Sequence, residues 1–147
     1  MISSLFYVVL CVVVGIGISI QAAANAALGK ATLPSFAALM SFVIGLVPIF
    51  IYFAVESKGF SEGNYENAKW WHFIGGVLGA AYIFVIIITV PRLGAATVLS
   101  ATIAGQVFLG LILDHFGFLG VQQRIASLGR IFATILIIIV AVLMSIF

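Results

Sequence analysis

Charge is what this chain has least of: only 7% of its 147 residues are charged, whereas 65% are hydrophobic. A soluble globular domain carries about a quarter of its residues as Asp, Glu, Lys and Arg, because these side chains cover its surface in water. The chain also contains no long polar segment that would fold separately in water. We therefore expect an integral membrane protein, surrounded for the most part by the lipid bilayer.

Cysteine is nearly absent as well, since Cys11 is the only one. A single cysteine excludes an intrachain disulfide, and no cysteines and histidines have the spacing of a zinc site. No charged residue lies in the middle of an apolar run, and the motifs of phosphate binding, zinc proteolysis and serine hydrolysis are missing. We expect no catalytic residues, no metal and no cofactor, and no basic face suggests a nucleic-acid partner.

What the chain does have is five apolar runs, each long enough for a membrane span of about 20 residues. They cover residues 4–28, 34–55, 70–90, 93–113 and 127–147, and residues 56–69 form a polar loop. Backbone groups in lipid must be hydrogen-bonded within a helix or a closed barrel, and the runs lack the polar–apolar alternation of barrel strands. The sequence predicts an all-α protein with five transmembrane helices in a single membrane domain, residues 1–147.

The charges between the runs give little preference for one orientation in the membrane. Five spans place the two ends of the chain on opposite sides. The cations on the N-terminal side are Lys58, Lys69, Arg124 and Arg130, and those on the other side are Lys30 and Arg92. Under the positive-inside rule this is a weak bias toward a cytoplasmic N-terminus, and so weak a bias permits insertion in either orientation. The first run resembles a signal peptide, but no basic residue precedes it, so we expect a retained helix.

Four polar side chains lie deep in the predicted spans, where each needs a hydrogen-bond partner or an aqueous cavity. They are Gln21, Asn25, Tyr82 and Gln106. Gln21 and Asn25 share one helix face because they are four residues apart. Gln106 lies within about 5 Å of the middle of its span at the helical rise per residue. One interpretation is that these groups bond adjacent helices to each other. The other, which we favour for the set, is that they line a common substrate path.

Small residues recur on the same helices, and among them Gly75 and Gly79 form a GxxxG pattern, with Gly105 on the fourth span. Small side chains let helix backbones approach closely in a membrane. We expect dense helix packing, including packing against a second copy of the chain. Five helices are few for enclosing a substrate path, so a homodimer is expected.

The pair Asp114–His115 falls at the end of the fourth span. An acid at a helix C-terminus opposes the helix dipole, so Asp114 needs a cation or a hydrogen-bond donor. Arg124 or Arg130 returns to the same side and is the expected partner, in an ion pair that fixes the turn. The alternative is a proton-sensitive gate, because histidine titrates near neutral pH.

Several segments together resemble a known family. These are "QAAANAALG" in the first span, "SFVIG" in the second, "GGVLGAAY" in the third, and "PRLGAAT" and "GQVFLGLILDHFGFLG" around the fourth. In this order they resemble the YdcZ-like family of the drug/metabolite transporter superfamily, and the resemblance covers nearly the whole chain.

The resemblance implies a small transporter of the bacterial inner membrane with five helices, of which two copies assemble, often antiparallel, into inverted repeats. The related small multidrug transporters exchange protons for cationic drugs through a glutamate in their first helix. This chain has Gln21 and Asn25 there instead. The difference favours a neutral or weakly charged solute, or coupling through another group.

The function that we expect is secondary transport of a small organic solute by alternating access in an antiparallel homodimer. The sequence leaves two alternatives open. One is a dual-topology dimeric channel for a small ion, and the other is a non-transporting membrane subunit that needs a partner.

Overall fold

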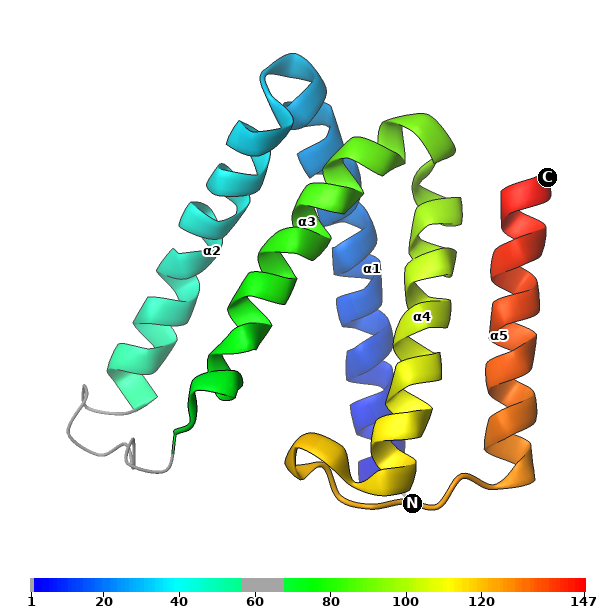
Figure 1. Ribbon diagram of the computed structural model, residues 1–147. Coiled ribbons are helices and arrows are strands. Elements are labelled where there is room, and N and C mark those ends of the chain that lie inside the picture. Colours follow the sequence, from blue (N-terminus) through cyan, green and yellow to red (C-terminus); the bar gives the residue numbers. More distant parts are fainter. Residues whose placement is uncertain (1, 57–67) are drawn as a thin grey trace. The chain divides into compact units, whose positions relative to one another are not determined.

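The protein folds into α-helices that are long enough to cross a membrane (Figure 1). The computed structural model describes residues 2–56 and 68–147, with side chains from Leu5 onward. These residues contain five helices of sufficient length and hydropathy for a span, and no strand. The predicted all-α fold with five membrane-spanning helices is therefore confirmed. Most of the predicted polar loop 56–69 lies outside the described residues.

The helices match the predicted runs to within a few residues: the first four end up to three residues later than predicted, and the fifth lies within its predicted run. They are α1 (Ile2–Ala31), α2 (Pro34–Glu56), α3 (Ile74–Leu93), α4 (Ala95–Phe116) and α5 (Leu128–Ile146), with short 3-10 helices η2 (Trp70–Phe73) and η3 (Phe118–Gly120). α3 continues past Pro91, because a proline removes one backbone N–H but keeps a helical φ. α4 includes Asp114 and His115 in its last turn and ends at Phe116. The next residue, Gly117, has a left-handed φ of 67°, as is common for a glycine after a helix.

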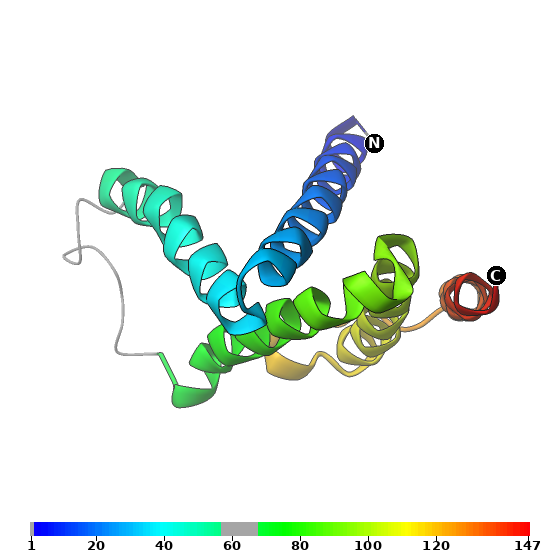
Figure 2. The same cartoon turned by 90° about the horizontal axis from the view of Figure 1, so that it is seen from above.

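The chain divides into two compact units, the first ending at Pro91 and the second running from Arg92 to Phe147. In the first unit, α1 and α2 form an antiparallel hairpin, and the two helices diverge from their short connection (Figures 1 and 2). Ala22 and Ala26 on α1, Ala37 on α2, and Ile86 and Ile87 on α3 are its buried apolar residues. Alanines at these positions let the helices approach closely, as membrane helices do.

The helices of this unit come especially close together at Gly29. A Cβ atom added to it would lie 2.6 Å from Cγ2 of Ile87 and 3.7 Å from Cβ of Ala37. Three helices therefore meet at a position where only glycine fits without displacing a neighbour.

The second unit is a hairpin of α4 and α5 that is tied near both ends. At one end the Thr97 hydroxyl donates to the carbonyl of Met144 over 2.9 Å. At the other, Asp114 and Arg130 form an ion pair. Ser127 caps α5, since its side chain accepts a hydrogen bond from the backbone N–H of Arg130 over 3.4 Å. The buried residues between the helices are mostly small: Val98, Ala104, Thr134 and Ala141.

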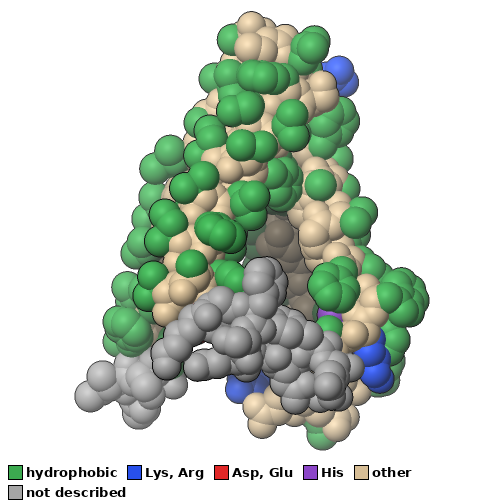
Figure 3. All heavy atoms as spheres, turned by 90° about the vertical axis from the view of Figure 1, so that its left-hand side faces the viewer, with side chains coloured by type: hydrophobic (Ala, Val, Ile, Leu, Met, Phe, Trp, Pro, Cys, Tyr) green, Lys and Arg blue, Asp and Glu red, His purple; other side chains and the backbone are tan. Residues whose placement is uncertain are grey.

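Most of the large apolar side chains face outward. Leu, Ile, Val and Phe residues along all five helices are exposed, and hydrophobic side chains predominate on the face drawn in Figure 3. In water such a surface would drive aggregation, whereas in a bilayer it is in contact with lipid tails. Trp70 and Trp71 open the third span, and the Lys69 ammonium lies 4.8 Å from the centre of the Trp71 ring. Aromatic and basic residues of this kind anchor a helix at the headgroup level.

The packing at Gly29 gives a stability prediction. Gly29→Ala should lower the free energy of unfolding by about 1–3 kcal/mol, because the added methyl overpacks the contact with Ile87. The melting temperature of the purified protein in detergent measures the effect. Gly15→Ala is the matched control, since a Cβ there meets nothing within 4 Å. Adding Ile87→Leu, which removes Cγ2, should recover part of the loss, and equal losses in the two alanine variants would contradict this account.

Candidate functional site

Three of the four predicted lining residues meet at one small cavity in the first unit. Gln21 and Asn25 on α1 and Tyr82 on α3 line it together with apolar residues such as Ile18 and Ile86. Its volume of about 10 Å³ is close to what a single water occupies. The Asn25 amide donates to the Ser41 hydroxyl over 3.1 Å and so also connects α1 to α2. The cavity has polar groups in a mostly apolar wall, and in this conformation it is too small for an organic solute.

Gln106 and the three glycines predicted to pack helices do not line this cavity. Gln106 is exposed on α4 in the second unit, so its part in a common lining stays a prediction. A Cβ atom added to Gly75, Gly79 or Gly105 would meet no described atom within 4 Å. The proposed role of these glycines in packing, including packing against a second copy, is likewise still a prediction.

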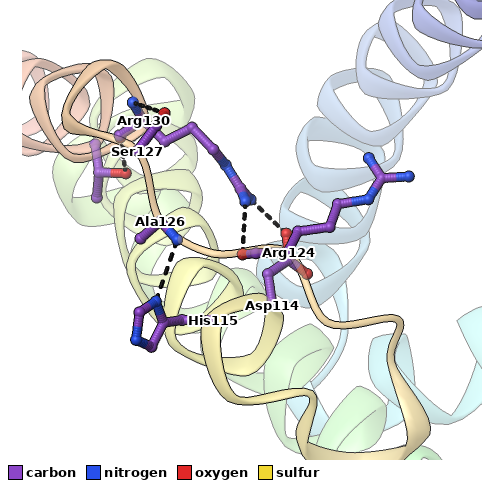
Figure 4. Close-up of polar contacts among 7 residues, drawn as sticks. Asp114, His115, Arg124, Ala126, Ser127 and Arg130 are labelled. Atoms are coloured by element: carbon purple, nitrogen blue, oxygen red, sulfur yellow. Dashed lines mark hydrogen bonds and ion pairs between the residues drawn. The ribbon is translucent and has the colours of Figure 1, made fainter.

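Asp114 and Arg130 bring the end of α4 to the start of α5 (Figure 4). Nη2 of Arg130 donates to Oδ2 of Asp114, and Nη1 donates to the carbonyl of Arg124 over 3.2 Å. Sequence reasoning left Arg124 and Arg130 as equal candidates for the partner of Asp114, and in the structure the guanidinium comes from Arg130. Arg124 takes part through its backbone, since its N–H donates to the carbonyl of Asp114 over 2.7 Å.

His115 also holds the connection between α4 and α5, through two hydrogen bonds. Its Nδ1 accepts a hydrogen bond from the backbone N–H of Ala126 over 3.1 Å, and its carbonyl accepts one from the Gln123 amide over 3.0 Å. The connection is therefore held against α4 by both the side chain and the backbone of His115.

A larger pocket lies between α4 and α5, next to the ion pair. Its volume is about 300 Å³, and Asp114, Arg130 and Thr134 form its polar wall. Val107, Gly110 and Leu111 form its α4 side. Sequence reasoning identified the two charges but missed Gly110 and Thr134. The spacing was available as a signal, because Gly110 precedes Asp114 by four residues and Thr134 follows Arg130 by four, so each shares a helix face with one charge.

Comparison with known proteins gives the family. The family described as "Putative inner membrane exporter, YdcZ" matches residues 6–143. The chain belongs to the YdcZ family. A relative from Escherichia coli (strain K12), "Inner membrane protein YdcZ", is 32% identical over 137 residues, which cover 89% of each chain. No solved structure matches this YdcZ-family chain.

Membership in the YdcZ family confirms the resemblance seen in the sequence. With five membrane-spanning helices, it assigns the protein to the inner membrane and to a transporter-type role. The family is one of membrane exporters and not an enzyme class.

The bond between His115 and Ala126 predicts that the His115 side chain holds the α4–α5 connection of this YdcZ-family protein in place. Loss of the Nδ1 acceptor should loosen the connection, because the backbone N–H of Ala126 loses its partner. A fluorine probe on cysteine at position 122, with Cys11 replaced by serine, should report a change in its NMR signal in His115→Leu.

Two variants isolate the effect. His115→Asn should keep the original signal, because its Oδ1 can accept the same hydrogen bond in the place of Nδ1. His72 also accepts a backbone N–H, from Lys69 over 3.1 Å, so His72→Leu is the matched control and should leave the signal at position 122 unchanged. An unchanged signal in His115→Leu would refute the prediction.

Proposed function

We propose that this protein is a secondary transporter that exports a small organic solute across the inner membrane by alternating access in an antiparallel homodimer. The observation that carries the proposal is the convergence of Gln21, Asn25 and Tyr82, from two helices, on one cavity inside a YdcZ-family membrane protein. Polar groups at such depth are costly unless they bond to each other, to water or to a solute.

The size of that cavity fits a carrier better than an open pore. A space for about one water blocks a continuous aqueous path but can widen when helices move. The close contacts that would have to adjust include the approach at Gly29 and the Asn25–Ser41 bond. Gln106 of each subunit would add an amide near the middle of the membrane. In an antiparallel pair the two copies would form the inverted repeats that alternating access uses.

Topology tests the antiparallel arrangement. With Cys11 replaced by serine, single cysteines are placed at Leu33, in the α1–α2 connection, and at Gln122, in the α4–α5 connection. Because the charge bias is weak, we expect a membrane-impermeant thiol reagent to label each site in about half of the molecules in intact cells. Labelling after permeabilisation gives the total for each site. Complete labelling of one site and complete protection of the other would contradict dual insertion.

The role of Gln106 is tested by export. Cells that express the chain should release a solute into the medium that control cells retain, as found by comparing the two media by mass spectrometry. Gln106→Leu should abolish this release while the protein still elutes as a dimer, because only the hydrogen-bonding group is lost. Gln106→Asn keeps an amide and should retain part of the activity. A variant that loses its dimer would identify Gln106 as a packing residue instead.

A further inference from the structure

The Asp114–Arg130 ion pair leaves some of its hydrogen-bonding atoms unused within the described part of the chain. Oδ1 of Asp114 takes part in no hydrogen bond with the part of the chain that the structure describes, and the guanidinium has more N–H donors than its two contacts use. The side chains are 38% exposed for Arg130 and 29% for Asp114, and both line the pocket of about 300 Å³ between α4 and α5. The pocket thus presents a negative and a positive hydrogen-bonding group side by side.

Apart from these two charges and Thr134, the pocket is apolar, and it reaches toward the middle of α4. Val107 and Leu111 line it on that side, and Gly110 adds no side chain that would fill it. Pockets for small molecules begin at about 300 Å³ and combine apolar walls with a few placed polar groups. This one has the volume for a molecule of amino-acid size with a charged head and a short apolar tail.

We propose that the α4–α5 pocket binds a small zwitterion that carries an apolar side chain, with its carboxylate on Arg130 and its ammonium group on Asp114. The charge balance selects this class. A lone anion or cation would add a net charge beside a neutral ion pair in a membrane, where an uncompensated charge is expensive. A zwitterion brings a charge of each sign and leaves the total unchanged.

The inference deepens the proposed function. It rests on that function only where it states that the bound solute is exported. It also adds a site near the end of α4, separate from the predicted lining by Gln21, Asn25, Tyr82 and Gln106. The apolar tail would lie against Val107 and Leu111, so neutral amino acids with branched or aromatic side chains fit better than glycine.

Binding to the purified protein tests the site directly. Leucine, valine and phenylalanine are the probes, and saturable heat of binding is measured by titration calorimetry in detergent. At least one of them should bind. For leucine, 4-methylpentanoate lacks the ammonium group and 3-methylbutylamine lacks the carboxylate, and each should bind more weakly by about tenfold or more because one contact is missing. The inference is overturned if none of the three amino acids binds, or if either analogue binds as well as leucine.

Gly110→Leu locates the binding. A Cβ at Gly110 meets nothing within 4 Å, so the larger side chain enters the pocket without a clash at its base and should remove binding. Leu109→Phe adds similar bulk to the neighbouring exposed position outside the pocket and should leave binding intact. If Gly110→Leu does not fold, Leu111→Trp fills the pocket from the same helix. Binding that persists in a folded, filled variant overturns the inference.

Export in cells separates the two proposals. Leucine binding that Gly110→Leu removes, without release of any solute from cells, would support the site and refute transport. Release of a solute that is unaffected in a folded Gly110→Leu protein would support transport and refute this pocket as its binding site.

Discussion

The constraint on which this structure depends is that lipid supplies no hydrophobic force between helices, since lipid tails are as apolar as the side chains that face them. The helices must be held by close backbone approach and by a few polar contacts. In the first unit these are the approach at Gly29 and the Asn25–Ser41 bond. In the second they are the Thr97–Met144 bond and the Asp114–Arg130 pair. The fold of each unit therefore depends on a small number of such contacts.

The positions of the two charges in the second unit follow from the same constraint. Asp114 lies in the last turn of α4 and Arg130 in the first turn of α5, so each opposes the dipole of its own helix. Because the helices are antiparallel, each charge lies beside the end of the neighbouring helix that it suits. The pair thus stabilises the antiparallel hairpin, while a parallel arrangement would leave both charges without a partner.

Sequence reasoning was most successful where a single physical rule decides the outcome. The five helices follow from hydropathy and from the need to bond every backbone group in lipid. The need of Asp114 for a cation follows from its place at a helix end, but two arginines return to that side. The backbone course of the connection decides between them, and it is not visible in composition or spacing. The pocket was missed for a related reason, because the spacing of Gly110 and Thr134 places each on one helix face with a charge but does not show that α4 and α5 bring the two faces together. The depth of Gln21, Asn25 and Tyr82 in their spans favoured a common lining, but no pattern in the sequence states that α3 crosses α1 near Gly29, which brings them together.

The way in which the connection between α4 and α5 is held determines which of its residues can vary among homologues. The connection is held at positions 124 and 126 through backbone groups, namely the N–H and carbonyl of Arg124 and the N–H of Ala126. The Arg124 side chain makes no hydrogen bond within the described chain. Homologues are therefore free to vary both side chains while the loop keeps its course, with proline as the forbidden residue because it has no N–H to donate. Selection on this contact should act on His115, whose side chain accepts the hydrogen bond, and not on the side chains at positions 124 and 126.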